Sequence, residues 1–189
     1  DIYQDSQSNL WIGTENGLNL YRPKLGEFVR FQANSRDEQS ISSHRIHSIY
    51  EDQHNTVWLG TWSTGVIKFS YHKKGIKHYF HRPANNNSLS DNNVWDFIED
   101  SDQKIWIGTN GGLNSFDPST NEFEHFTHDP DNANSLSSNR IFDLELDSSG
   151  NIWMSTIKGV NKFNPDSQSV ERFLHEPNNP NSLSYNTSW

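Results

Sequence analysis

The sequence predicts an all-β fold made of four copies of one four-stranded antiparallel unit. Phrases close to Trp-Ile-Gly-Thr recur at a step of 47 or 48 residues, at Trp11, Trp58, Trp106 and Trp153. A second phrase, Ser-Leu-Ser or Ser-Ile-Ser, keeps the same step and begins at Ser40, Ser88, Ser135 and Ser182. A constant step of this length indicates a supersecondary unit that is copied because it cannot bury its apolar face alone.

The third copy shows the elements of the unit in order. Apolar, aromatic or alternating stretches short enough for strands fall at residues 94–99, 104–108, 113–116 and 122–126. We name these strands A, B, C and D. Asp, Ser, Asn, Gly and Pro separate them, and Asn110-Gly-Gly112 fits a tight B–C turn because glycine accepts positive φ. A long polar connection from strand D, residues 129–139, leads to strand A of the next copy.

Four antiparallel strands in about 47 residues match one blade of a β-propeller. The predicted repeats are residues 1–47, 48–95, 96–142 and 143–189, which together form a single propeller region. A helical solenoid does not fit, because turn residues interrupt the chain every 8–12 positions. A parallel β-helix would have shorter coils and less aromatic bulk.

The two ends of the chain are in phase. Trp189 shares its register with His47, Trp95 and Phe142, and residues 186–189 followed by residues 1–5 would complete a strand A. Three interpretations follow: an arc of a larger propeller, four blades closed on themselves, or two chains closed head to tail into one ring. Because an open arc would expose apolar faces and strand edges, we expect self-association.

Composition excludes several kinds of partner and site. The net charge of −9 and the absence of clustered Lys and Arg argue against nucleic acid and anionic lipid. The chain has no Cys, so disulfides and Cys-based zinc sites are excluded. No apolar stretch approaches the roughly 18–20 residues of a membrane span, so we expect no membrane insertion by this segment.

Several repeated residues have a structural interpretation. We expect the strand B tryptophans to pack between blades, and the glycine after each to allow close approach of a neighbouring blade. Asp100 is predicted to accept backbone hydrogen bonds in its turn. Asp1, Asp96 and Asp143 share a strand A register, which indicates hydrogen bonding between inner strands or a solvated channel lining. His residues one blade apart are too distant to ligate one ion, so we expect neither metal nor cofactor.

Taken together, three sequence stretches resemble the two-component regulator propeller repeat over essentially the whole chain. They are Asp-x-x-Gly-Asn-Ile-Trp at 147–153, Ile-Gly-Thr-Asn-Gly-Gly-Leu-Asn-Ser-Phe-Asp-Pro at 107–118 and Asn-Ser-Leu-Ser-Ser-Asn at 134–139. The chain departs from the pattern at Ser155, where glycine is usual, and at Trp62-Ser-Thr64, which holds one extra residue. Four repeats are also fewer than such proteins usually have, which favours a fragment.

The resemblance implies a periplasmic, non-catalytic input module of a membrane-anchored bacterial signalling protein, such as a histidine kinase or diguanylate cyclase. Its ligand would be a small molecule or an oligosaccharide. Two alternatives stay open. One is a protein-interaction scaffold; the other is a lyase-like or glycosidase-like propeller enzyme, which needs paired carboxylates or a His beside a carboxylate on the channel face.

Propellers bind ligands on the face formed by D–A connections and B–C turns, where contacts vary between blades. The B–C turn register holds Glu15, Trp62, Asn110 and Ile157; the start of strand A holds Arg45, Asn93, Arg140 and Thr187. Trp62 can stack on a sugar or contact a peptide, and the two arginines can bind a carboxylate or sulfate through their planar fork. The structural alternatives are that Trp62 packs on an adjacent loop and that the arginines bridge loops or stay solvated. The predicted ligand-binding residues are Trp62, Arg45, Asn93, Arg140, Glu15 and Asn110.

Overall fold

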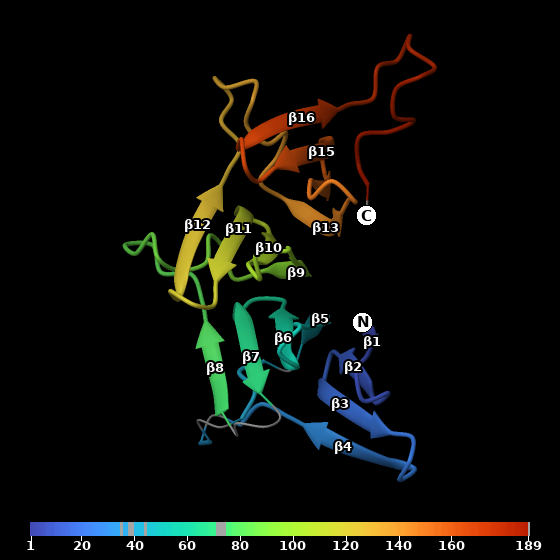
Figure 1. Ribbon diagram of the computed structural model, residues 1–189, viewed down its shortest axis with the longest axis vertical. Helices are drawn as coiled ribbons and strands as arrows, with labels where there is room; N and C mark the ends of the chain where they lie inside the picture. Colours follow the sequence, from blue (N-terminus) through green and yellow to red (C-terminus); the bar gives the residue numbers. More distant parts are fainter. Residues whose placement is uncertain (35, 38–39, 44, 71–74, 189) are drawn as a thin grey trace. The chain divides into compact units, whose positions relative to one another are not determined.

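The computed structural model describes residues 1–34, 36–37, 40–43, 45–70 and 75–188. The chain forms two compact units: unit 1 contains Asp1–His81 and Asn92–Val94, and unit 2 contains Arg82–Asp91 and the residues from Trp95 onward. Each unit carries two four-stranded antiparallel sheets (Figure 1). Since Trp189 lies outside the described residues, completion of one strand A by the two chain ends stays a prediction.

Every sheet is a simple meander whose strand order follows the chain. The first blade is β1 (Ile2–Gln4), β2 (Leu10–Thr14), β3 (Gly17–Arg22) and β4 (Glu27–Phe31). The second is β5 (Ile46–Glu51), β6 (Thr56–Thr61), β7 (Val66–Ser70) and β8 (Gly75–Tyr79). The third is β9 (Val94–Glu99), β10 (Ile105–Thr109), β11 (Gly112–Asp117) and β12 (Glu122–Phe126). The fourth is β13 (Ile141–Leu146), β14 (Ile152–Thr156), β15 (Gly159–Asn164) and β16 (Ser169–Phe173).

The predicted fold class is therefore confirmed. Strands β9 and β12 have the bounds that the sequence predicts, and β10 and β11 differ from their predicted bounds by one residue at each end. The B–C turn of the third blade depends on Gly112, whose φ is 122° and whose Cβ, if it had one, would lie 2.5 Å from the carbonyl oxygen of Phe126. No helix in the described part of the chain is long and apolar enough to cross a membrane.

Trp11 and Trp106 pack between blades, as predicted for the strand B tryptophans, whereas Trp153 is half-buried and stacks on Phe173 of its own blade. Trp11 is 1% exposed and contacts Phe31 of its own blade and Phe69 of the second, at ring-centroid distances of 5.9 and 6.0 Å. In unit 2, Trp106 contacts Phe163 of the fourth blade at 5.6 Å. Offset and edge-on ring pairs of this kind stabilise beyond the area they bury.

Glycine after the tryptophan allows neighbouring blades to pack closely, as the sequence predicts. A Cβ on Gly13 would lie 2.9 Å from Cγ2 of Ile46, in the inner strand of the second blade. A Cβ on Gly108 would lie 3.0 Å from Cγ2 of Ile141, in the inner strand of the fourth. Any larger residue at either position must push the adjacent strand A away.

One aspartate joins the A–B turn of each blade to its tryptophan. In the third blade, Oδ1 of Asp100 accepts hydrogen bonds from the backbone N–H groups of Asp102 and Lys104, and Oδ2 accepts one from Nε1 of Trp106 at 2.7 Å. The predicted turn role of Asp100 is confirmed, and the indole contact adds to it. The same three bonds recur at Asp5, Asp52 and Asp147.

A second set of aspartates links the inner strands of adjacent blades. Within unit 1, Oδ2 of Asp1 accepts the backbone N–H of Ile49 at 2.8 Å; within unit 2, Oδ2 of Asp96 accepts that of Leu144 at 2.9 Å. Hydrogen bonding between inner strands is thus confirmed for both residues, whereas Asp143 is exposed. Burial raises the pKa of Asp96 to about 7, although the Leu144 and Phe97 N–H groups lower it; Asp143 and Glu145 raise it further.

Substituting Asp100 by Ala should lower the free energy of unfolding by about 2 kcal/mol, because a buried indole N–H and two turn N–H groups lose their acceptor. Urea denaturation measures this change. Asp102→Ala is the matched control, since Asp102 is an exposed side chain in the same turn. An equal loss in both variants would contradict the assigned role.

Substituting Asp96 by Asn should make stability less dependent on pH. A folded-state pKa of about 7 means that the folded chain binds more protons than the unfolded chain between about pH 4 and 7, so wild-type stability falls as pH rises through this window. Asn keeps an acceptor for Leu144 and carries no charge, so we expect a gain of about 2 kcal/mol at pH 8 and little at pH 4. Denaturation at both pH values, with exposed Asp102→Asn as control, tests this; a uniform gain would refute it.

Candidate functional site

The candidate site lies at the end of a blade where strand A begins and strand B ends. In the second blade, Ile46 pairs with Thr61, and the backbone N–H of Trp62 donates to the carbonyl oxygen of Arg45 at 3.4 Å. The predicted arginine and the predicted tryptophan are therefore neighbours, although 17 residues separate them in the chain. Oγ1 of Thr61 closes the adjoining turn by donating to the carbonyl oxygen of Gly65.

At this end of the blade, a β-bulge in strand A changes the direction of one side chain. The β5–β6 register shifts between Ile46 and Ser48, and the β13–β14 register shifts between Ile141 and Asp143. The residue inside each shift has no partner in the ladder; it is His47 in the second blade and Phe142 in the fourth. A bulge bends its strand and turns the extra side chain out of strict alternation, so the aromatic ring points toward the B–C end.

In unit 1 these features form one recess of about 420 Å³. Its lining includes Arg45, His47, Trp62, Glu15 and Asp1. Trp62 is 41% exposed and stacks on the imidazole of His47, with ring centroids 4.9 Å apart and planes inclined by 25°. The guanidinium carbon of Arg45 lies 5.9 Å from the centroid of Trp62, within the range of a cation–π contact.

The surroundings of His47 favour its neutral form. Burial lowers the pKa of His47, and the Arg45 guanidinium lowers it further. The neutral ring supports Trp62 without adding a charge. The recess can thus offer an aromatic face, one guanidinium fork and the exposed carboxylate of Glu15, a combination suited to a polar ring-shaped ligand.

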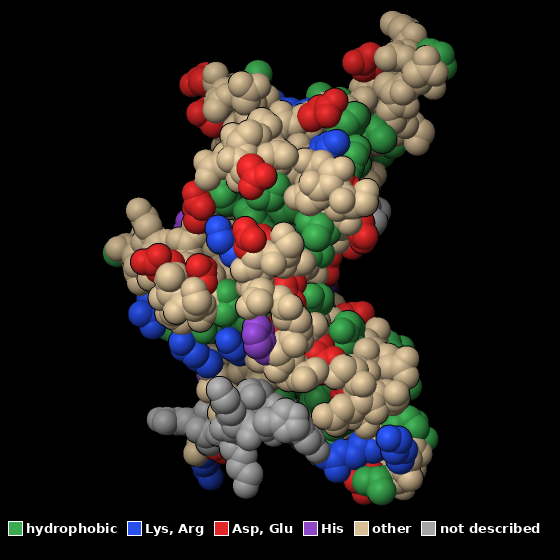
Figure 2. All heavy atoms as spheres, viewed as in Figure 1, with side chains coloured by type: hydrophobic (Ala, Val, Ile, Leu, Met, Phe, Trp, Pro, Cys, Tyr) green, Lys and Arg blue, Asp and Glu red, His purple; other side chains and the backbone are tan. Residues whose placement is uncertain are grey.

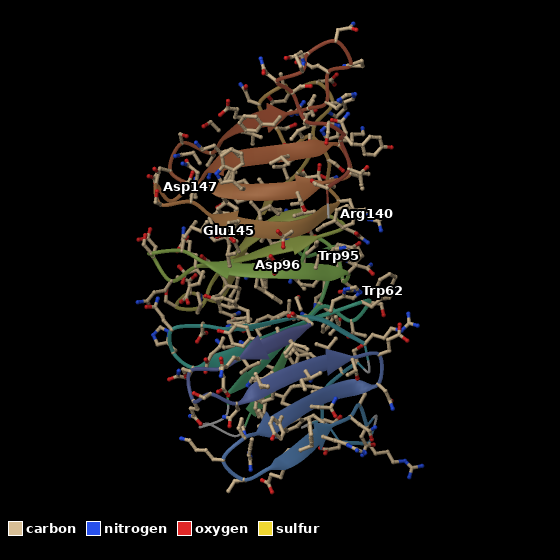
Figure 3. All side chains as sticks on the ribbon, turned by 90° about the vertical axis from the view of Figure 1, so that its right-hand side faces the viewer. Trp62, Trp95, Asp96, Arg140, Glu145 and Asp147 are labelled. Atoms are coloured by element: carbon tan, nitrogen blue, oxygen red, sulfur yellow. The ribbon has the colours of Figure 1, made fainter. Side chains whose placement is uncertain are left out.

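Unit 2 has a related cluster around Trp95. Nε1 of Trp95 donates to Oδ1 of Asn110 at 2.9 Å, and its ring meets Phe142 edge-on at 5.2 Å. The Arg140 guanidinium carbon lies 5.8 Å from the Trp95 ring and 5.2 Å from the Phe142 ring. Figure 3 shows Trp95 and Arg140 together at one end of the strands of unit 2, opposite Asp147. Two further predicted site residues, Asn110 and Arg140, thus meet through an aromatic side chain.

Asn93 also belongs to the B–C end of the blades. Asn93 follows Asn92, whose carbonyl oxygen accepts the N–H of Gly65, so it lies at the B–C end of the second blade. The sequence favours packing between blades for the aromatic residues at the strand A register, among them His47, Trp95 and Phe142. Phe142 is 7% exposed and meets Trp95 of the adjacent blade, so both fit this prediction, whereas His47 stacks on Trp62 of its own blade. The sequence signal for His47 is its position two residues after Arg45, at the register of the predicted site residues.

Three histidines of unit 2 hold loops. In unit 2, Nε2 of His125 lies 2.6 Å from the carbonyl oxygen of Ser88, and Nδ1 of His128 lies 2.6 Å from that of Leu136. The His175 ring makes the matching contact to Leu183. No group of three or more His, Cys, Asp or Glu side chains suited to a metal ion occurs in the part of the chain that the structure describes.

Known structures share this fold. The extracellular domain of a hybrid two component system from B. thetaiotaomicron superposes on this chain with a TM-score of 0.80 at 24% sequence identity. The match covers 92% of this chain and 24% of that domain's chain. Virginiamycin B lyase from Staphylococcus aureus superposes with a TM-score of 0.65 at 13% identity, over 94% of this chain and 55% of the lyase. At these identities the likeness concerns the fold alone.

Sequence comparison identifies the repeats. Histidine kinase P4 of Formosa agariphila is 33% identical over 108 residues, which are 56% of this chain and 8% of the kinase, so the chain spans a small part of that relative. The family model "Two component regulator propeller" matches residues 1–16, 40–63, 88–111 and 135–158, once in every blade. The chain therefore carries four two-component regulator propeller repeats.

Proposed function

We propose that this chain is part of the ligand-sensing propeller region of a periplasmic, membrane-anchored signalling protein, and that it binds a small molecule or oligosaccharide at the B–C end of its blades. The half-exposed Trp62 carries this proposal. A large aromatic ring in a turn, braced by His47 and flanked by Arg45 and Glu15, is a ready stacking surface for a sugar ring. The two-component regulator propeller repeats and the similarity to a histidine kinase support a role in signalling.

The strand A aspartates support a role without catalysis. An enzymatic propeller would need free carboxylates, or a His beside a carboxylate, positioned around a reacting bond. In Asp1 and in Asp96, one carboxylate oxygen already accepts a backbone hydrogen bond from the neighbouring inner strand. In this proposal the segment recognises a ligand, and any output chemistry belongs to another part of the full protein.

A protein-interaction role is the second candidate, favoured by one surface of unit 1. The β3–β4 hairpin exposes Leu25 by 67% and Phe28 by 58%, beside Arg22 and Lys24. Figure 2 shows hydrophobic and basic side chains together at this hairpin, at the lower right. Exposed apolar side chains rimmed by charge occur at protein contacts, and this hairpin lies at the outer edge of its blade.

Replacing Trp62 by Ala should weaken binding of a recognised oligosaccharide by at least about tenfold, since the stacking surface is lost. Isothermal titration with a panel of tri- and tetrasaccharides, combined with the Trp62 indole signal in ¹H–¹⁵N spectra, measures this. Ile157→Ala is the matched control, because Ile157 shares the B–C register and is 38% exposed in the fourth blade. Unchanged affinity in Trp62→Ala, or a Trp62 signal that no saccharide shifts, would contradict the proposal.

A further inference from the structure

Two arginines at one repeat register make the same kind of contact. Arg45 and Arg140 each lie two residues before the bulged residue of strand A, and each places its guanidinium near an aromatic ring. Both side chains are exposed at the B–C end of their blades. Other blades carry Asn93 and Thr187 at this register, so the repeat itself does not require arginine.

Neither guanidinium is neutralised by a carboxylate among the described residues. Other basic side chains in that part of the chain do pair with carboxylates, as Arg22 does with Glu27 at 3.1 Å and Lys162 with Asp147 at 3.9 Å. Asp1 and Glu15 line the same recess as Arg45, but neither comes within 4.0 Å of it as an ion pair. Among the described residues, a chain with a net charge of −9 thus keeps two arginines at this end of its blades with no carboxylate at ion-pair distance.

The contact with the ring leaves the arginine able to bind an anion. A guanidinium near an aromatic ring is attracted by the ring quadrupole, while its N–H donors remain directed along its edges. Those donors form a fork that matches the two oxygens of a carboxylate or sulfate. Trp62, at 41% exposure, keeps ring surface available beside this fork.

The two acidic side chains of the recess, Asp1 and Glu15, differ in their contacts and exposure. Oδ2 of Asp1 accepts the N–H of Ile49, and Oδ1 accepts the N–H of Ile2, so this carboxylate is committed to the backbone. Glu15 is exposed in the B–C turn of the first blade and carries a charge that would repel an anion. Glu15 would therefore affect the binding of two ligand classes in opposite directions. Its carboxylate would strengthen binding of a neutral sugar through contacts with hydroxyl groups and weaken binding of an acidic sugar.

We propose that Arg45 and Trp62 form a subsite for a ring that bears a carboxylate, of the uronic acid class, with the carboxylate on the Arg45 fork and the ring on Trp62. This inference rests on the function proposed above and narrows its ligand from oligosaccharides in general to acidic ones. The unit 2 cluster repeats the arrangement, with Arg140 beside Trp95 and Phe142.

Trigalacturonate and its fully methyl-esterified form are the probes, because they share every ring and differ in charge. Titration at low salt should show at least about tenfold tighter binding of the acid than of the ester. Arg45→Ala should abolish this preference and leave the affinity for the ester within about twofold, with Arg45→Lys between them. Glu15→Gln should raise the affinity for the acid about two- to threefold.

Arg36→Ala is the matched control, since it removes an exposed arginine from a connection outside the recess. Equal losses in Arg45→Ala and Arg36→Ala would overturn the subsite, because binding would then follow overall charge. Equal binding of acid and ester, weakened by Glu15→Gln, would overturn the acidic class and leave the proposed function standing. Failure of both probes and of neutral oligosaccharides to shift the Trp62 indole signal would overturn both.

Discussion

In every blade, one aspartate carboxylate ties the turn between the first two strands to the tryptophan of the second. One oxygen takes two backbone N–H groups of the turn, and the other takes the indole N–H, at 3.0, 2.8, 2.7 and 3.1 Å in the four blades. A buried indole needs an acceptor, and a tight turn leaves N–H groups that need one too. A single side chain meets both needs and fixes the ring that neighbouring blades pack against.

This constraint acts at one end of strand B, and the variable residues occupy the other. The A–B turn, the tryptophan and the following glycine are repeated because they determine how closely one inner strand approaches the next. Beyond the threonine that closes the B–C turn, the side chains differ from blade to blade: Glu15, Trp62, Asn110 and Ile157. The residues that shape the core and the residues that vary thus lie at opposite ends of the same strands, which lets the B–C end change without disturbing the core.

A third repeated feature, a set of hydrogen bonds around the serine of the Ser-Leu-Ser phrase, holds the D–A connections. In unit 2, Oγ of Ser135 accepts the N–H of Asp129 and donates to backbone carbonyl oxygens, while Arg172 of the fourth blade donates four hydrogen bonds to residues 132–136. Leu136 is 1% exposed beneath this loop. The Ser-Leu-Ser phrase therefore encodes an ordered connection, and this order allows strand A to begin at a defined place beside the B–C turn.

The sequence alone determined the blade count, the strand order, the burial of the strand B tryptophans and the register at which exposed side chains vary. These follow from short-range periodicity and from a repeat step that any packed sheet must respect. Only the tertiary structure decided that Trp62 meets His47 and Arg45, that Trp95 joins Arg140 to Asn110, and that the turn aspartates bind indoles. Such meetings depend on a one-residue bulge and on contacts across strands, and a bulge reverses which way a side chain points without leaving a mark in the local pattern.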